Sequence, residues 1–515
     1  MRSFKNNLLI SLAAAQMFLC AACGGSSGSG SSSSSSNKDA VDQVSGSSAS
    51  NSDTDTSATE SAAKKDDVVV TLGLMCESED PLLNDAIRDF NNADNGCHIE
   101  IKLMSSRYDD EGHGIDYTED DLRAIDFSTL QTLMNDGGID IVGGQTFFDD
   151  AKFELLKQKG AFADLYDFME NDPEVNTSTL NQHILELNEL DGELYNIPQF
   201  YVVRTIISPS EYGGTTENWT IDEFIDRWNE MPDGATIEGS NCAEYIFYNL
   251  LRQNLPAFVD EENVEVHFDS DDFRKMLEFC KQFPSNNGGK ADYNFNAPMM
   301  TKNLIINCVG NSIITDINPL TYEETNYRLR DGRYTLVGYP TSDRKGAYLT
   351  STTCGWAICR NSSDEKKEAA WKFIRQFYTE EYQTENGVMQ YEYVDGNGNK
   401  IVNYYAEREG FCINNAARKK IAENTLNGMY DNKDEVRTAQ GHEITIVDEL
   451  KLDEQDVEFI ENYVESIERW DNDVDRELFW IVNDEVLSYL GGGQDIDTTI
   501  ALIQNRASIW LSEIS

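Results

Sequence analysis

The sequence predicts an α/β protein, because apolar strand patterns alternate with amphipathic helix patterns along the chain. Residues 67–75 form a near-continuous apolar run, Asp-Val-Val-Val-Thr-Leu-Gly-Leu-Met, which is typical of a strand buried on both faces of a parallel sheet. A polar loop, an amphipathic helix over 82–91 and an alternating strand over 98–104 follow. This strand–helix–strand order implies a right-handed crossover and a ligand crevice at the carboxyl ends of the strands.

The rest of the body continues the same alternation. A helix over 129–135 leads into a short buried strand over 139–142. Strand patterns recur at 303–309, 312–317 and 347–359. Amphipathic helix patterns occupy the last third of the chain, at 366–378, 453–470, 477–490 and 498–511. The body is therefore expected to be α/β throughout.

Composition and charge exclude several classes of function. The chain of 515 residues has 41 Lys and Arg against 92 Asp and Glu, a net charge of −51. A charge this negative repels phosphate backbones, which argues against nucleic-acid binding. The 5 His are scattered, with no pair at helical spacing for a zinc site. With 40% hydrophobic residues the chain has material for a large core, and its length suits two or three domains.

The amino-terminal segment has the pattern of an export signal. Arg2 and Lys5 precede an apolar run over 8–20, which is too short to span a bilayer but suits a signal peptide. The run ends in Cys-Ala-Ala-Cys-Gly-Gly, which resembles a bacterial lipobox with Cys23 as the lipidated residue. We therefore expect a lipoprotein signal peptide over 1–22. The alternative is an ordinary secretory signal with incidental cysteines.

Residues 23–66 are predicted to be a lipidated cysteine followed by a disordered tether. Residues 24–36 are Gly and Ser alone, and the following thirty or so contain no aromatic residue. Such a segment buries too little surface to offset its ordering entropy. As a flexible coil it reaches roughly 35 Å. We expect the lipid and this tether to hold the folded body at the extracellular face of the cell membrane.

Local patterns in the folded body occur in a recognisable order. They are GIDIVGG at 138–144, KGAFADLY at 159–166, LDGELYNIP at 190–198, WTIDEF at 219–224, GWAI at 355–358 with DEKKEAAWKFI at 364–374, and the closing helices around 485–506. In this order they resemble the family 1 extracellular solute-binding proteins of bacterial ABC sugar importers. The resemblance implies a type II periplasmic-binding-protein-like fold, with two lobes that are each a mixed sheet flanked by helices, and a ligand cleft between them.

The same resemblance implies where the chain passes between the lobes. The crossings would fall near 199–202, 343–349 and 411. The N-terminal lobe would comprise 67–199 plus 343–410, and the C-terminal lobe 200–342 plus 411–515.

A carbohydrate ligand sets requirements that can be sought in the loops after the strands. Sugar rings need aromatic platforms for their apolar faces, and carboxylates or amides for their hydroxyl groups. These loops, the first crossing and a late helix supply the candidate ligand contacts Glu77, Asp80, Gln145, Tyr201, Asp316, Trp356 and Trp480.

Most of these residues also have a purely structural interpretation. Glu77 and Asp80 are placed to cap the helix that begins near 82. Asp316 suits a turn before a proline, and Tyr201 and Trp480 lie among apolar residues that suit a core. Both interpretations stand at this point.

Function is expected to be capture without catalysis. The sequence has no Gly-x-Ser-x-Gly, Walker or Gly-x-Gly-x-x-Gly motif, and Asp395–Asn399 lacks the glycine and final glutamate of a calcium loop, which favours a hairpin turn. We expect no catalytic residue, cofactor or metal, and a monomer whose partners are a carbohydrate and the permease subunits of an ABC transporter. The alternatives are a secreted polysaccharide-active enzyme and a glycan-binding surface protein without a transport role.

The eight cysteines that follow Cys23 are predicted to be mostly free thiols. Their spacing is irregular, and a core of this size is stable without disulfide bonds even in an exported protein. Thiol titration of the denatured, unreduced chain should therefore detect most of them. Two or fewer reactive groups would contradict the prediction.

Overall fold

The structure is a computed structural model. It describes residues 67–74, 80–104, 127–143, 150–238, 241–260, 263–285, 304–310, 332, 334–351, 355–387, 389–394, 400–405, 410–429, 436–439, 442–445, 453–470 and 476–514. The predicted signal peptide, Cys23 and the tether lie outside the described residues.

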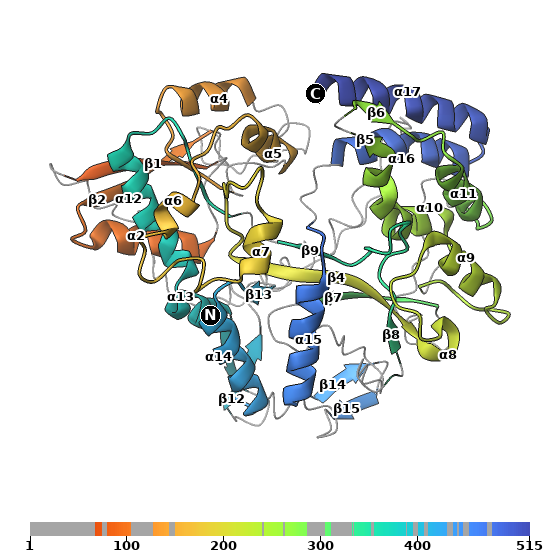
Figure 1. The fold of residues 1–515 in the computed structure, drawn as a ribbon. Helices are drawn as coiled ribbons and strands as arrows, with labels where there is room; N and C mark the ends of the chain where they lie inside the picture. Colours follow the sequence, from red (N-terminus) through yellow and green to blue (C-terminus); the bar gives the residue numbers. More distant parts are fainter. Residues whose placement is uncertain are drawn as a thin grey trace, which may run out of the picture. The chain divides into compact units, whose positions relative to one another are not determined.

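The first sheet has the predicted parallel strand–helix–strand arrangement (Figure 1). Its strands are β1 (Val68–Leu74), β2 (Cys97–Leu103), β3 (Ile141–Val142) and β10 (Ala357–Ile358), in the order β10-β3-β1-β2. β1 runs parallel to both β2 and β3, and β10 is antiparallel to β3. Val70, Leu72 and Leu74 are fully buried, as an apolar strand covered on both faces requires.

Helices pack on this sheet and continue around it. α2 (Pro81–Asn92) contacts β2, and α12 (Asp364–Ile374) contacts β1. The other helices of this part of the chain are α4 (Phe127–Asn135), α5 (Asp150–Gln158), α6 (Tyr166–Met169) and α7 (Gln182–Leu187). α12 ends in a turn of 3-10 helix, Arg375–Tyr378, which leads to α13 (Glu380–Gly387).

The second sheet is built around one long strand, β4 (Phe200–Pro209), and all of its pairings are antiparallel. Its neighbours are β13 (Phe411–Cys412), β7 (Ile306–Gly310), β8 (Tyr334–Leu336) and β9 (Tyr348–Thr350). Segments near 200, 349 and 411, where the chain was expected to cross between lobes, are thus hydrogen-bonded neighbours in one sheet. The boundaries of the lobes themselves stay a prediction.

Helices account for most of the remaining described chain. They are α8 (Ser210–Gly213), α9 (Ile221–Asn229), α10 (Ala243–Ile246), a π-helix (Phe247–Leu251), a 3-10 helix (Arg252–Phe258), α11 (Asp271–Cys280), α14 (Asn415–Leu426), α15 (Glu454–Ser466), α16 (Arg476–Leu490) and α17 (Ile496–Ile514). α16 and α17 pack against each other (Figure 1). The remaining strands form three hairpins, β5 (Val259–Asp260) with β6 (Glu265–Val266), β11 (Met389–Val394) with β12 (Lys400–Tyr405), and β14 (Val436–Ala439) with β15 (His442–Thr445).

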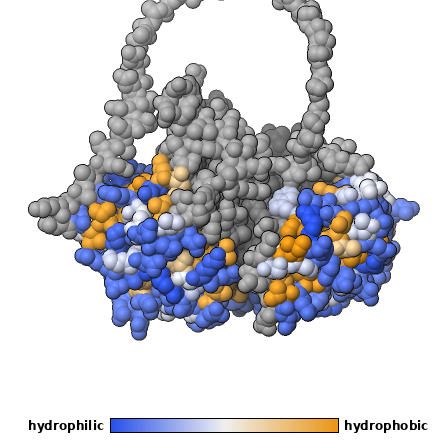
Figure 2. Space-filling view, turned by 90° about the horizontal axis from the view of Figure 1, so that it is seen from above, coloured by the Kyte–Doolittle hydropathy of each residue, from blue (hydrophilic) through white to orange (hydrophobic). Residues whose placement is uncertain are grey.

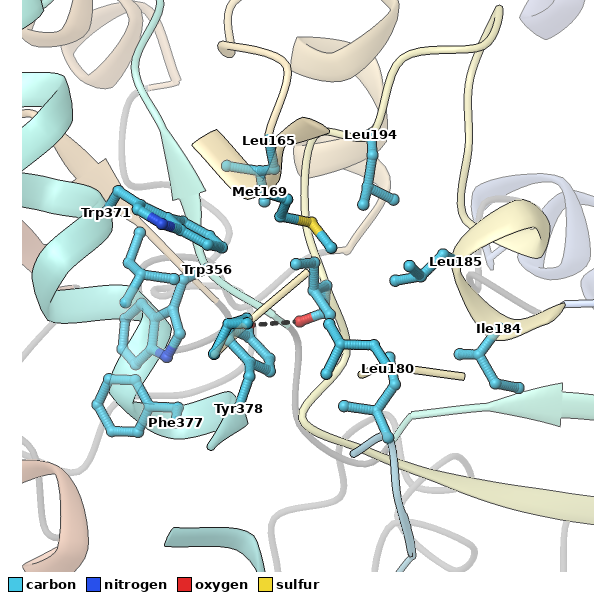
Figure 3. Close-up of a cluster of buried hydrophobic side chains, with 14 of the residues drawn as sticks. Leu165, Met169, Leu180, Ile184, Leu185, Leu194, Trp356, Trp371, Phe377 and Tyr378 are labelled. Carbon is cyan, nitrogen blue, oxygen red and sulfur yellow. Dashed lines mark hydrogen bonds between the residues drawn. The ribbon is translucent and has the colours of Figure 1, made fainter. Parts of the chain in front are cut away.

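Two large hydrophobic cores hold these elements together. The first gathers residues from β1, α2, α7 and α12, and also from α14 and α15; Figure 3 shows part of it, around Met169, Trp371 and Tyr378. There the Tyr378 hydroxyl donates a hydrogen bond to the Ile197 carbonyl at 2.7 Å. The second core gathers residues from α9, α11, α16 and α17. Trp219 and Phe224 lie in it, at the two ends of the capping box that Thr220 and Glu223 form at the start of α9.

The surface matches the acidic composition. Most described side chains on the face in Figure 2 are hydrophilic, with hydrophobic residues scattered among them. The described large hydrophobic residues that are well exposed are Leu103, Val264, Met429, Leu502 and Ile509. Within the described ranges, no helix is both long enough and apolar enough to span a membrane.

The structure confirms most of the expected elements and corrects one. The segment 347–359 was expected to be a single strand, but it forms β9 and β10, which belong to different sheets. Gly355 lies between these two strands, and only glycine fits there, because an added Cβ would lie 1.9 Å from the Ile197 carbonyl oxygen. The chain changes sheets at this close backbone approach. β11 and β12 form the predicted hairpin, whereas 312–317 lies outside the described residues.

The thiol prediction holds for the cysteines that the structure describes. Cys97, Cys280, Cys359 and Cys412 are buried free thiols, and Cys242 is a half-buried one. Burial raises the pKa of the Cys412 thiol to about 12, which keeps it protonated and unreactive near neutral pH.

Asp140 has a fully buried carboxylate that connects the first sheet to α12. Asp140 accepts hydrogen bonds from the Ser362 hydroxyl at 2.6 Å and from the Thr71 amide at 2.9 Å. The Lys366 ammonium lies 2.7 Å from the same carboxylate. The main chain of Asp140 also bonds to Thr71 and to the amide of Cys359. Through its side chain and its main chain together, this one residue links β1, the start of β3, the end of β10 and α12.

Replacing Asp140 with Ala should lower the free energy of unfolding by about 3–5 kcal/mol, because Lys366 and a buried hydroxyl lose their partner together. Chemical denaturation of both proteins measures this. Asp89→Ala is the matched control, since Asp89 forms an exposed pair with Arg88 and should cost about 0.5 kcal/mol or less. Equal losses in the two variants would contradict the role given to Asp140.

Candidate functional site

Three of the predicted ligand contacts, Glu77, Gln145 and Asp316, lie outside the described residues and stay predictions. Asp80 is described, and it is the N-cap of α2. Its carboxylate accepts a hydrogen bond from the Leu82 amide at 3.0 Å. The structural interpretation of Asp80 is therefore confirmed, and its role toward a ligand stays a prediction.

Tyr201 is completely buried in β4. Its ring stacks on Phe411 with centroids 5.5 Å apart, and its hydroxyl accepts a hydrogen bond from the Arg418 guanidinium at 3.1 Å. Arg418 lies on α14 and also pairs with Glu461 of α15 at 3.0 Å. Burial raises the pKa of Tyr201 to about 12, although the charge of Arg418 opposes that shift. Tyr201 thus joins β4 to two helices from inside the protein.

Trp356 lies in the first core, where it is only 5% exposed. Its ring stacks on Phe377 with centroids 5.7 Å apart (Figure 3). Its other neighbour is Gly143, where an added Cβ would lie 2.4 Å from a ring carbon of Trp356. A glycine is therefore required at 143 for close packing. The sequence left Trp356 open between a ligand contact and a core residue; the described contacts are those of a core residue, and a ligand role for it stays a prediction.

Trp480 is half-buried on α16, beside the second core. Its ring meets that of Phe479 edge to face, at 5.2 Å between centroids. The indole N–H is buried and has no hydrogen-bond partner among the described residues. A partly accessible ring with an unused donor has the properties expected of a side chain that contacts a polar ligand.

Sequence reasoning missed a group of arginines that converge on two tyrosines of the second core. Arg204 of β4 is directly opposite Tyr348 of β9 in the sheet register, so their side chains lie on the same face. The Tyr348 ring lies 5.6 Å from that of Tyr339, and the Arg469 guanidinium lies 5.7 Å from the centroid of Tyr348. Together with Arg252, we refer to these residues as the arginine–tyrosine cluster.

Arg252 joins the cluster from an irregular helix. It follows the π-helix directly, and its guanidinium lies 5.1 Å from the ring centroid of Tyr248 and 5.8 Å from that of Phe479. Because the buried ring of Phe479 also contacts Trp480, a chain of aromatic contacts connects Arg252 to Trp480. π-helical turns occur frequently at functional sites.

The charges around Tyr339 show that the arginines share one environment. Burial raises the pKa of Tyr339 well above its ordinary value, and the nearby Tyr348 and Glu238 act in the same direction. The positive charges of Arg204 and Arg252 act in the opposite direction. Both guanidinium groups are therefore within electrostatic range of one hydroxyl.

Hydrogen bonds fix the remaining side of the cluster. The Arg469 guanidinium donates to the Gln253 carbonyl at 2.9 Å, and the Gln253 amide donates to the Tyr348 hydroxyl at 3.4 Å. Gln253 is 5% exposed, so these groups are held in place by the core. The arrangement offers positive charge, aromatic faces and amide groups together, and no group of residues within the described ranges is suited to hold a metal ion.

Comparison with known proteins addresses the fold. No protein-family model matches the chain, and no curated protein matches its sequence. Among solved structures, the chain is similar to a periplasmic oligogalacturonide-binding protein from Yersinia enterocolitica, with a TM-score of 0.50 and 13% identity over 87% of this chain and 100% of that one.

Two further solved structures are similar to this chain. The sugar-binding protein MalE from Xanthomonas citri has a TM-score of 0.49 at 11% identity and covers 87% of this chain and 98% of its own. A family 1 extracellular solute-binding protein from Alicyclobacillus acidocaldarius has a TM-score of 0.48 at 13% identity, over 87% and 99%.

The similarity to these solved structures concerns the fold. The chain has the two-lobed α/β fold of the extracellular solute-binding proteins, as the order of its sequence motifs predicted.

Replacing Tyr201 with Phe should cost about 1.5–3 kcal/mol near neutral pH, because the hydroxyl bonds to a charged, buried partner. The stability of the two proteins should also respond differently to alkali. The unfolded chain releases the Tyr201 proton near pH 10 and the folded chain near pH 12, so the folded state holds more protons between those values. Stability therefore falls as pH rises through this window.

The variant lacks that contribution, so wild-type stability should fall more steeply than that of Tyr201→Phe, by up to roughly 1.4 kcal/mol for each pH unit. Denaturant unfolding at several pH values from 9 to 12 measures the difference. Parallel curves for the two proteins would show that Tyr201 titrates alike in both states.

Proposed function

We propose that this protein is a lipid-anchored extracellular solute-binding protein that captures an oligosaccharide and delivers it to an ABC permease. The fold supports this most directly, since a two-lobed α/β protein without a catalytic motif is suited to enclosing a ligand. The Yersinia neighbour is named for binding an oligogalacturonide. The half-buried arginines of the arginine–tyrosine cluster add hydrogen-bond donors and Trp480 adds a partly exposed aromatic ring, both suited to a sugar.

The membrane role follows from the sequence pattern. Cys23 carries the lipid, residues 24–66 form the tether, and the body works as a monomer on the outer face of the cell membrane. Closure of the lobes on the ligand lets the permease distinguish the loaded protein from the empty one, because the ligand stabilises the closed form selectively.

A thermal-unfolding screen of the full chain against monosaccharides, oligosaccharides, amino acids and peptides tests this proposal. A ligand present at a hundred times its dissociation constant should stabilise the protein by about 2.7 kcal/mol, which raises the melting temperature by a few degrees. Each stabilising mixture is then analysed for products.

Stabilisation by a glycan that is recovered intact supports capture. Cleavage of that glycan would instead support a polysaccharide-active enzyme. Stabilisation by a peptide and by no glycan would overturn the carbohydrate assignment.

A further inference from the structure

The arginine–tyrosine cluster concentrates positive charge in a strongly acidic protein. Arg204, Arg252 and Arg469 all lie close to the same pair of tyrosine rings, whereas the whole chain has a net charge of −51. All three arginines are half-buried, so solvent screens their charges less than those of exposed side chains. Three positive charges therefore converge on one pair of rings, with the carboxylates of Glu238 and Asp343 also nearby.

The acidic groups near the cluster have other partners. The Glu238 carboxylate is buried and accepts a hydrogen bond from the Tyr245 hydroxyl at 2.6 Å. Asp343, near Arg469, accepts a hydrogen bond from the Lys345 amide at 3.0 Å. Among the residues that the structure describes, Arg204 makes no ion pair and no side-chain hydrogen bond. Within this part of the chain, its guanidinium therefore has no carboxylate in direct contact.

An arginine that is half removed from water without a counter-charge is costly to keep. A ligand that carries an anionic group offsets this cost, because the planar guanidinium matches a carboxylate or a sulfate with two parallel hydrogen bonds. Arg204 is held on a central strand, and Arg469 is fixed by Gln253 and Tyr348, so both are positioned before a ligand arrives. Such preorganisation lowers the entropic cost of binding.

We propose that the arginine–tyrosine cluster binds the anionic groups of an acidic oligosaccharide, one that carries carboxylate or sulfate substituents. This inference rests on the proposed function, and it specifies the class of the captured glycan. Tyr248 and Trp480, which are partly exposed and pack on either side of the buried Phe479, lie beside Arg252, where their rings suit the apolar face of the next sugar ring.

Calorimetric titration of the full chain with matched probes tests the proposal. The first pair of probes is tri-galacturonate and its methyl ester, which has the same rings without the negative charges. The second pair is neocarrabiose 4-sulfate, which has no carboxylate, and neocarrabiose, its neutral unsulfated counterpart. At least one charged probe should bind ten times or more tightly than its neutral partner, and the pair that shows this identifies the carboxylate or the sulfate as the anion.

Variants assign the effect to the cluster. Arg204→Gln and Arg469→Gln should each weaken binding of the charged probe at least tenfold while changing binding of the neutral probe less than threefold. Arg88→Gln, an equal change of charge at an exposed site on α2, should alter neither. Thermal unfolding without ligand establishes that each variant is folded, and Arg204→Lys, which keeps the charge but loses the planar fork, replaces Arg204→Gln if that variant does not fold.

Four results would overturn the inference. The first is equal binding of charged and neutral probes, and the second is binding confined to neutral glycans. Both would leave sugar capture intact. Equal weakening of both probes by Arg204→Gln would show that Arg204 only supports the structure. If no glycan of any class binds the protein, the proposed function fails, and this inference fails with it.

Discussion

The structure depends on the backbone hydrogen bonding of one strand, β4. Every residue from Phe200 to Pro209 has a partner in β13, β9, β7 or β8. Tyr201 and Val203 belong to the first core and Ile206 to the second, so a single strand serves both. Its neighbours β8, β9 and β13 contain only two or three residues each, and strands this short are stable only through such pairing.

The sequence predicted those helices and strands whose bounds follow from a local pattern of apolar residues. It did not predict those whose bounds depend on contacts with residues far away in the chain. The local sequence alone predicts the apolar run of β1 and the amphipathic faces of α2, α16 and α17. The spacing of the apolar residues in each element shows which of its faces is buried. The segment 347–359 has the same apolar character throughout, yet it divides between two sheets. The division occurs at the contact between Gly355 and the backbone of Ile197, which no local pattern encodes.

The same distinction applies to the candidate site. Trp356 follows a polar stretch and a glycine, which locally predicts exposure, but Phe377 and Gly143 enclose its ring. The arginine–tyrosine cluster is assembled from β4, the irregular helix, β9 and the segment after α15. No short motif could indicate it. The one local signal was Arg204 itself, a charged residue inside the apolar run of β4.

An acidic chain can bind an acidic ligand if local fields outweigh the distant ones. At physiological ionic strength, charges more than about 8 Å away are largely screened when they are exposed. Among the described residues, the buried acidic side chains are only those of Asp140, Glu238 and Asp456. The other described acidic groups slow the approach of an anion more than they weaken the final complex. Guanidinium groups that are half-buried against tyrosine rings act at contact distance with little screening. If the arginine–tyrosine cluster binds an anionic glycan as we propose, the net charge of −51 slows the arrival of the glycan, and the arginines determine how long it stays bound.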